Sequence, residues 1–313
     1  MDLERFCATS RVVIVAGKGG VGKTTVTAAL SVAAARVGAS VLIVEVEGKS
    51  GLAGSFGRPA LTYEEAVLHA GVRARTLTPD DALVEYLNDH GLRRIGRRLA
   101  NSGALEVVST AVPGMKDILV LGKVKQLERA AAADLIVIDA PAAGHAVSFL
   151  LSAQGLLDAV RVGPIRKQAQ DVVELLTDPA RCQVILVTLA EETPVNELVE
   201  TAFAIEDRAG VALGPVVVNG CVEPIPDLGT IAAEPGLSAT FDADPATLVA
   251  AAEFRLDLAR RQRGQQERLA QMLPLPQIHL PFLFTAGIGP GEIDTLADAF
   301  ADRVHALDPV TAT

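Results

Sequence analysis

Short apolar runs alternate along the chain with longer segments in which apolar residues recur at helical spacing. The short runs are rich in β-branched residues, which is typical of buried strands. They predict six core strands, at residues 11–16, 41–46, 135–140, 184–189, 215–219 and 277–281. Because segments long enough for helices separate these strands, we predict an α/β fold with a mostly parallel sheet covered by helices.

The first two predicted strands flank a glycine-rich loop and a helix. The loop spans residues 17–22, and the segment from Lys23 to Val37 carries apolar residues at helical spacing. Gly38 then ends the helix before the second strand. Strand, helix and strand form a βαβ unit whose crossover should be right-handed, so the two strands should be parallel.

Between residues 58 and 133 the pattern becomes helical. Thr62-Tyr-Glu-Glu65 matches a capping box, and Thr78-Pro79 followed by two acids predicts a helix that Gly91 stops. A basic amphipathic helix follows, with Arg93, Arg94, Arg97 and Arg98 around Leu92, Ile95 and Leu99. Its basic face could pack on the protein itself, dock an acidic partner or lie near a membrane. We predict one domain, residues 1–313, with a helical insertion at 58–133.

A last long helix should begin at Asp244-Pro245 and continue to about Leu273. Its arginines alternate with acidic residues, which a solvated helix face explains.

Composition and sequence pattern disfavour several classes of partner and site. The net charge of -10 disfavours nucleic acid and anionic membrane surfaces. No stretch of about 18 residues is apolar enough to predict an integral membrane segment. The acidic start, Met1-Asp2-Leu3-Glu4, is unlike a secretory signal, so we expect a cytoplasmic protein. Three widely spaced cysteines, Cys7, Cys182 and Cys221, predict neither a disulfide framework nor a zinc site.

One motif carries specific chemistry. The residues Gly17, Lys18, Gly19, Gly20, Val21, Gly22, Lys23, Thr24 and Thr25 match G-x-x-x-x-G-K-[ST] between a strand and a helix. In this context the backbone N–H groups of the loop cradle nucleotide phosphates at the helix N-terminus. Lys23 should reach the β- and γ-phosphates, and Thr24 should ligate Mg²⁺.

Two further residues extend this site. Lys18 is not needed for the cradle itself, and it could supply charge in trans to a nucleotide in a facing subunit; alternatively it is an exposed loop lysine. Asp139 ends an apolar strand, where a carboxylate can hold a magnesium-bound water. The small residues that follow Asp139, including Gly144, could sense the γ-phosphate.

Together these motifs resemble the deviant Walker A ATPases of the ArsA/Get family, which includes the arsenite-pump ATPase and the tail-anchored-protein targeting ATPase. The resemblance runs from about residue 11 to residue 300 and includes GKGGVGKTT at 17–25, DAPAAGH at 139–145 and VTLAEETP at 187–194. It implies ATP and Mg²⁺ as cofactors. It also implies that Asn219 reads adenine and that Pro281 and Phe282 close over the base.

The switch I segment departs from the family pattern. The family has DPAHS after the second strand, whereas this chain has Glu47-Gly-Lys-Ser-Gly51, so Glu47 stands where the catalytic aspartate stands. The longer side chain predicts slow hydrolysis, because a shift of about 1 Å in a positioning group can cost on the order of 10²-fold in rate. Alternatively, the chain mainly binds ATP while a partner performs the chemistry.

The resemblance also implies an assembly. A composite site with Lys18 acting in trans requires a second subunit, so we expect either a homodimer or a heterodimer with a related ATPase subunit. The chain has only Met1, Met115 and Met272 and no cysteine cluster, so neither a transmembrane-segment client nor arsenite is favoured. Positioning ATPases of the ParA/MinD type and nitrogenase-like iron–sulfur proteins fit less well. The client protein is not identified by the sequence.

Overall fold

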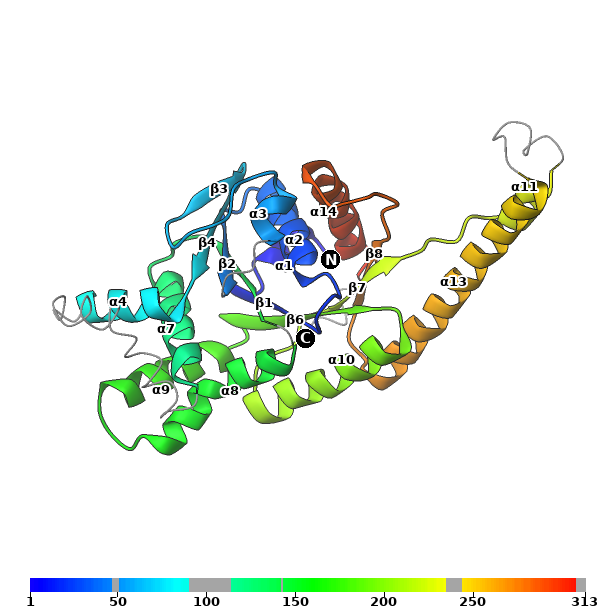
Figure 1. Cartoon of the computed structure of the whole chain (residues 1–313). Coiled ribbons are helices and arrows are strands. Elements are labelled where there is room, and N and C mark those ends of the chain that lie inside the picture. Colours follow the sequence, from blue (N-terminus) through cyan, green and yellow to red (C-terminus); the bar gives the residue numbers. More distant parts are fainter. Residues whose placement is uncertain (47–50, 90–113, 142, 235–243, 308–313) are drawn as a thin grey trace.

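The computed structural model describes residues 1–46, 51–89, 114–141, 143–234 and 244–307 (Figure 1). One sheet with the strand order β3-β4-β2-β5-β1-β6-β7-β8 organises these residues. Its strands are β1 (Val12–Ala16), β2 (Val41–Val46), β3 (Ala66–His69), β4 (Val72–Leu77), β5 (Leu135–Asp139), β6 (Cys182–Leu189), β7 (Val216–Cys221) and β8 (Gln277–Pro281). All neighbouring strands are parallel except β3 and β4, which pair antiparallel. The predicted α/β fold with a mostly parallel sheet is therefore confirmed.

The central strands bury both of their faces. Every residue of β1, β2 and β5 is buried, which explains why these segments read as continuous apolar runs. Alternate residues point to opposite faces, so Val13 packs in the core on one side of the sheet and Ile14 in the core on the other.

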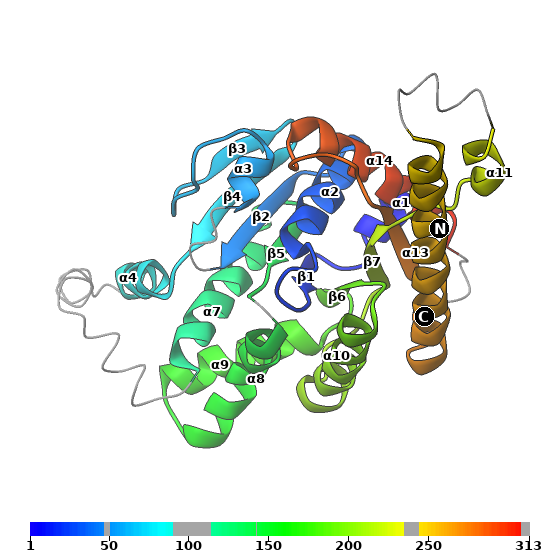
Figure 2. The same cartoon turned by 45° about the vertical axis from the view of Figure 1, so that its right-hand side comes forward.

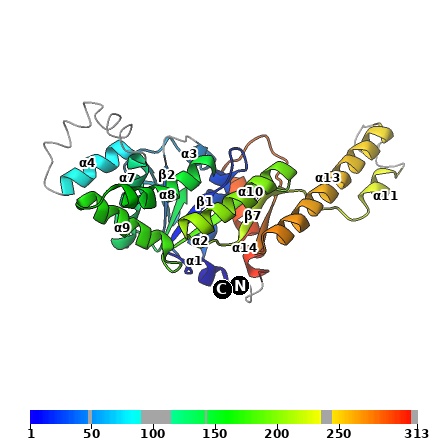
Figure 3. The same ribbon diagram turned by 90° about the horizontal axis from the view of Figure 1, so that it is seen from below.

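Helices cover both faces of the sheet (Figures 2 and 3). On one face lie α1 (Leu3–Cys7), α2 (Lys23–Arg36), α3 (Gly51–Ser55) and α14 (Pro290–His305). On the other lie α7 (Met115–Arg129), α8 (Ala143–Ala159), α9 (Pro164–Thr177) and α10 (Glu192–Ala204), with the π-helical turn η1 (Ile205–Ala209). The helix α4 (Pro79–Asp89) packs beside α7.

A long helix, α13 (Pro245–Met272), extends away from the sheet beyond β7 and β8, with the short α11 (Leu228–Ala232) against it (Figure 1). Asp244 caps α13 because its carboxylate accepts a hydrogen bond from the Thr247 backbone N–H at 3.1 Å. The helix predicted from Asp244-Pro245 to about Leu273 is thus confirmed.

The expectation that residues 58–133 are helical is wrong for β3 and β4, and the sheet gains these two strands. Thr62 to Glu65 do not start a helix. The strand β4 was not predicted because the two arginines of VRARTL interrupt its apolar pattern, and their partners lie in the segment just before β3. Arg75 stacks over the Tyr63 ring at 4.2 Å, and Arg73 pairs with Glu65.

Other expectations for this segment have different outcomes. The helix predicted from Thr78-Pro79 is present as α4. The basic helix around Arg93 to Arg98 lies outside the described residues. That the chain forms one domain stays a prediction.

All three cysteines are buried thiols on separate elements. Burial raises the pKa of Cys7 and Cys182 to about 12 and that of Cys221 to about 11. Each thiol therefore stays protonated near neutral pH and is a poor nucleophile.

Within the described part of the chain, no helix is both long enough and apolar enough to cross a bilayer.

Candidate phosphate and magnesium site

The glycine-rich loop joins β1 to α2, and at two of its glycines a side chain would collide with a neighbouring strand. Gly17 and Gly22 have φ angles of +156° and +89°, which residues with a Cβ rarely adopt. A Cβ on Gly17 would collide with the Val187 carbonyl on β6, and one on Gly22 would collide with the Asn219 amide on β7. The loop therefore lies directly against the two strands on one side of β1.

Lys23 begins α2 and points back into the loop. Its ammonium donates a hydrogen bond to the Lys18 carbonyl at 2.9 Å, and the residue is only 7% exposed. The N-cap residue of α2 is Gly22, which has no side chain with which to cap the first turn. A buried cation and the positive end of a helix dipole thus lie together at the loop, which is the electrostatic environment that binds phosphate groups.

The next residue, Thr24, contacts the neighbouring strand. Its hydroxyl donates a hydrogen bond to Asp139 Oδ2 at 2.7 Å. Asp139 is the last residue of β5, lies opposite Val15 of β1 and is fully buried. The parallel pairing of β5 with β1 therefore brings the end of one strand to the loop that follows the other.

A hydroxyl beside a carboxylate is a donor set that fits Mg²⁺. Magnesium prefers oxygen ligands and is usually bound by one or two protein groups together with waters and substrate phosphates. The described residues contain no cluster of three or more His, Cys, Asp or Glu that could hold a metal ion by itself. The pair Thr24 and Asp139 is therefore suited to a metal shared with a nucleotide.

A second buried carboxylate, which the sequence analysis did not select, lies on the adjoining strand. Glu45 of β2 is opposite Asp139 of β5 in the sheet register and is 2% exposed. Thr76 of β4 donates a hydrogen bond to Glu45 Oε2 at 2.9 Å. The sequence did contain a signal that Glu45 is special, namely a glutamate inside the apolar run VLIVEV. An acid on a buried strand needs a specific environment.

Asn219 of β7 approaches the loop from the other side. Its amide donates to the Val21 carbonyl at 3.0 Å. The turn after Asn219 is held by Gln262 of α13, whose side chain accepts from Val222 N at 2.7 Å and donates to the Gly220 carbonyl at 3.0 Å. The long helix thus fixes the end of the strand that carries Asn219.

Lys18 leaves the cradle and points toward α10. Its ammonium forms an ion pair with Glu197 at 3.1 Å, and both side chains are partly exposed. Sequence reasoning missed Glu197, because nothing in the local pattern relates it to the loop. The contact depends on the packing of α10 beside β6.

The remaining predicted residues are less closely associated with the loop. Gly144 lies in the first turn of α8. Pro281 ends β8, and Phe282 follows it half-exposed, within van der Waals reach of a Cβ placed on Gly220. Glu47 lies outside the described residues.

Comparison with known proteins places these observations in a family. The family model described as anion-transporting ATPase matches residues 10–161, which include the loop and Asp139. ATPase BagA of Mycobacterium tuberculosis is 38% identical over 223 residues. The chain belongs to the ArsA/Get-type family of P-loop ATPases.

The similarity to individual family members is partial. The alignment with ATPase BagA covers 67% of this chain and 64% of BagA. ATPase get3 of Schizosaccharomyces japonicus is 28% identical over 141 residues, which are 44% of this chain and 42% of get3. This ArsA/Get-type chain therefore spans less than two-thirds of the length of these curated relatives.

Proposed function

We propose that this ArsA/Get-type protein binds ATP with Mg²⁺ and hydrolyses it slowly, as a dimeric switch whose nucleotide state controls a client protein. The observation that carries the proposal is the Thr24–Asp139 hydrogen bond beside the buried ammonium of Lys23. This arrangement supports the proposal, because P-loop proteins bind a magnesium nucleotide through a lysine, a hydroxyl and a carboxylate.

The residues of the loop have separate roles in this proposal. The backbone of Gly17 to Gly22 and the ammonium of Lys23 bind the phosphate oxygens, and Thr24 and Asp139 hold Mg²⁺, Asp139 through a bound water. The metal supplies positive charge that stabilises phosphate oxygens. Asn219 reads adenine and, through its hydrogen bond to Val21, also keeps the loop against β7. Pro281 and Phe282 bound the space for the base.

A second subunit completes the site. Lys18 is paired with Glu197 of its own chain, and both side chains are partly exposed, so a modest free energy suffices to separate them. In a dimer Lys18 then reaches the nucleotide of the facing subunit and stabilises charge in the transition state. The facing subunit is a second copy of this chain or a related ATPase.

The sequence also favours a second candidate function. Glu47 stands in place of the switch I aspartate of the family. In this alternative the chain is an ATP-binding regulatory subunit of a heteromeric complex, and a catalytically complete paralogue performs the hydrolysis.

Steady-state ATP hydrolysis, measured with and without Mg²⁺ together with the oligomeric state, tests both candidates. The switch ATPase predicts magnesium-dependent turnover and ATP-dependent dimerisation, both lost in Lys23→Ala and retained in Lys116→Ala, an exposed lysine of α7. The regulatory subunit predicts ATP binding that requires Lys23 but no turnover by the chain alone. Absence of ATP binding would refute both.

A further inference from the structure

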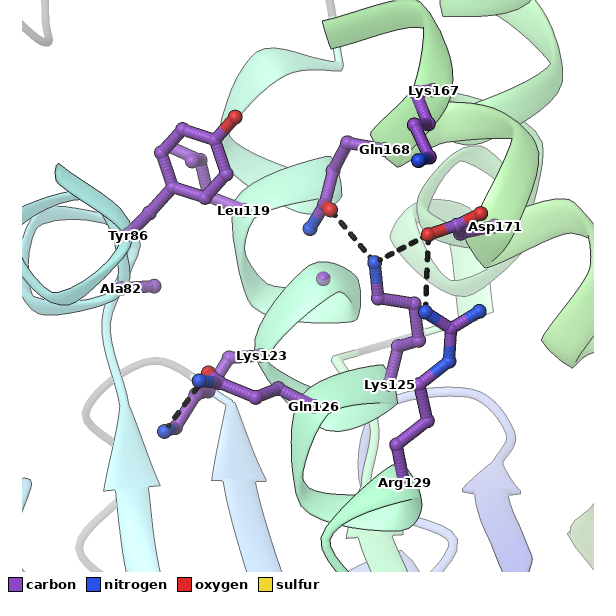
Figure 4. A pocket seen from close by; sticks show the side chains of 11 residues that line it. Ala82, Tyr86, Leu119, Lys123, Lys125, Gln126, Arg129, Lys167, Gln168 and Asp171 are labelled. Atoms are coloured by element: carbon purple, nitrogen blue, oxygen red, sulfur yellow. Dashed lines mark hydrogen bonds and ion pairs between the residues drawn. The ribbon is translucent and has the colours of Figure 1, made fainter. Parts of the chain in front are cut away.

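A cavity of about 400 Å³ lies between α4, α7 and α9 (Figure 4). It is on the helix layer that covers the opposite face of the sheet from α2, so it is separate from the phosphate loop. Its volume is within the range of small-molecule sites.

The wall formed by α7 and α9 is strongly cationic. Four side chains that line it are positively charged and one is negatively charged: Lys123, Lys125, Arg129 and Lys167 against Asp171. Although burial acts in the opposite direction, Lys125, Arg129 and Lys167 hold the pKa of Asp171 below its ordinary value. Even a carboxylate at this wall is therefore stabilised in its anionic form.

Lys125 is the central cation of this wall. Its side chain is 9% exposed, and its ammonium donates to Gln168 Oε1 at 2.8 Å and to Asp171 Oδ2 at 3.0 Å. Arg129 donates to the same carboxylate oxygen at 3.2 Å. Two cations thus share one carboxylate, which leaves excess positive charge in a partly dehydrated space.

Lys123 faces the α4 side of the cavity. Its side chain is also 9% exposed, and its ammonium donates to Glu85 Oε1 at 2.6 Å and to Gln126 Oε1 at 3.3 Å. Because Glu85 neutralises Lys123, the excess charge lies on the opposite side, at Lys125, Arg129 and Lys167. Leu119 and the Tyr86 ring form a less polar wall across from these cations (Figure 4).

Gly122 supports a specific arrangement at the cationic wall. It lies in the interior of α7, where glycine is a poor helix former. A Cβ at this position would collide with the Gln168 side-chain amide. Glycine therefore lets Gln168 pack against α7 and present its oxygen to Lys125.

We propose that this cavity binds a small organic anion, whose charged group contacts Lys125, Arg129 and Lys167 and whose apolar part packs against Leu119 and Tyr86. Asp171 holds Lys125 and Arg129 in place without cancelling their combined charge. The site does not depend on the proposed nucleotide function, since none of these residues belongs to the phosphate loop.

Isothermal titration of the full-length protein with matched probes tests the proposal. The probes are 3-phenylpropionate, 3-phenylpropan-1-ol and 3-phenylpropylamine, which share an apolar body and differ in charge. The carboxylate should bind at least about tenfold more tightly than the alcohol or the amine, and its affinity should fall with added salt. Equal affinity for the three probes, or no saturable binding of the carboxylate, would overturn the proposal.

Variants of the lining residues, each compared with a control lysine outside the cavity, test whether the carboxylate binds in this cavity. Lys125→Met and Lys167→Gln should each weaken carboxylate binding, by about tenfold for the buried lysine, whereas Lys116→Gln on the exposed side of α7 should not. Gly122→Ala should also weaken it, because the added methyl group displaces Gln168. Near-ultraviolet circular dichroism verifies that each variant is folded. Because Lys167 is exposed, its substitution should not change the stability of the fold.

A last variant separates the cavity from the phosphate loop. Lys23→Ala should leave carboxylate affinity unchanged. Loss of binding in Lys23→Ala together with no effect of Lys125→Met or Lys167→Gln would assign the anion to the loop and refute the cavity site.

Discussion

The side-chain amide of Asn219 donates a hydrogen bond to the Val21 carbonyl at 3.0 Å, across 198 positions of sequence. This bond joins the end of β7 to the middle of the phosphate loop. A Cβ on Gly22 would occupy the place of the Asn219 amide, so the two residues fit each other closely.

Removing this contact should weaken nucleotide binding. Asn219→Ala leaves the loop without its bond to β7, and we expect ATP affinity to fall by up to about tenfold. Gly22→Ala should abolish binding, because the new side chain collides with Asn219 and the φ of +89° disfavours alanine. Fluorescent-nucleotide titration measures both, and Asn88→Ala on α4 is the control that should bind as the native protein does.

Asp139→Asn should weaken Mg²⁺ binding without lowering the stability of the fold. Asparagine can still accept the Thr24 hydrogen bond but lacks the charge, so the apparent affinity for Mg²⁺ in the presence of ATP should fall about 10–100-fold. Thermal stability without nucleotide should not fall, since a buried charge has been removed. Thr24→Ser keeps the hydroxyl and should retain magnesium dependence. Unchanged Mg²⁺ affinity in Asp139→Asn would contradict the assigned role.

Shortening Glu47 should speed hydrolysis. Glu47→Asp restores the side-chain length of the family's switch I aspartate, and we expect kcat to rise on the order of 10²-fold. Steady-state turnover is the measurement, and Lys23→Ala combined with Glu47→Asp should remain inactive. If Glu47→Asp turns over no faster than the native chain, the length of this side chain does not limit the reaction.

His279 should make the protein less stable in mild acid. Burial, and to a smaller extent Arg303, lower the pKa of His279 below its ordinary value. The unfolded state therefore binds a proton at higher pH than the folded state does, so this residue lowers the free energy of unfolding as pH falls below about 6.5, until the folded-state pKa is reached.

Urea unfolding at pH 7.5 and pH 5.5 tests the role of His279. His279→Gln should lose less stability than the native protein between these pH values. The lowered pKa values of Glu85 and Asp171 act at more acidic pH and are common to both proteins, so the difference between the two proteins isolates the histidine. If the native protein and His279→Gln lose the same stability between pH 7.5 and pH 5.5, His279 does not cause the acid sensitivity.

Phe300 should be a main contributor to stability on the α2 face. It is fully buried on α14 and contacts Phe6 edge to face, with ring centroids 5.8 Å apart. Phe300→Ala should lower the free energy of unfolding by about 3–5 kcal/mol, because it leaves a cavity. Phe254→Ala, at a 64% exposed position of α13, should change it by about 0.5 kcal/mol or less. Denaturant unfolding measures both changes in the free energy of unfolding, from the shift of the midpoint when the dependence of free energy on denaturant concentration is unchanged.

The sequence predicted the parts of the fold that depend on local signals. The runs at β1, β2 and β5 are continuous because both of their faces are buried, and Asp244-Pro245 is a local cap. The strand β4 was missed because Arg73 and Arg75 interrupt its apolar pattern. Their partners, Glu65 and Tyr63, become neighbours only when β3 and β4 pair.

The candidate site was predictable to a similar extent. The P-loop motif selected Lys23 and Thr24 as candidates and the strand end selected Asp139, and the structure joins Thr24 to Asp139 by a hydrogen bond. The ion pair of Lys18 with Glu197 and the clamp of Gln262 on Gly220 could not be predicted, because each joins segments whose proximity depends on how α10 and α13 pack. The cavity between α4, α7 and α9 had no sequence signal except a glycine inside a helix.

The order of the strands shows that the residues matched by the family model do not form a sheet that is complete by itself. The family model ends at residue 161, whereas β1 lies between β5, which is inside that segment, and β6, which is outside it. A truncated chain that stopped there would leave one edge of β1 without a hydrogen-bonding neighbour and expose apolar side chains that β6 and its helices cover. Such a fragment should aggregate rather than bind nucleotide, so any engineered form of this nucleotide site needs β6 and the helices beside it as well as the residues that the family model matches.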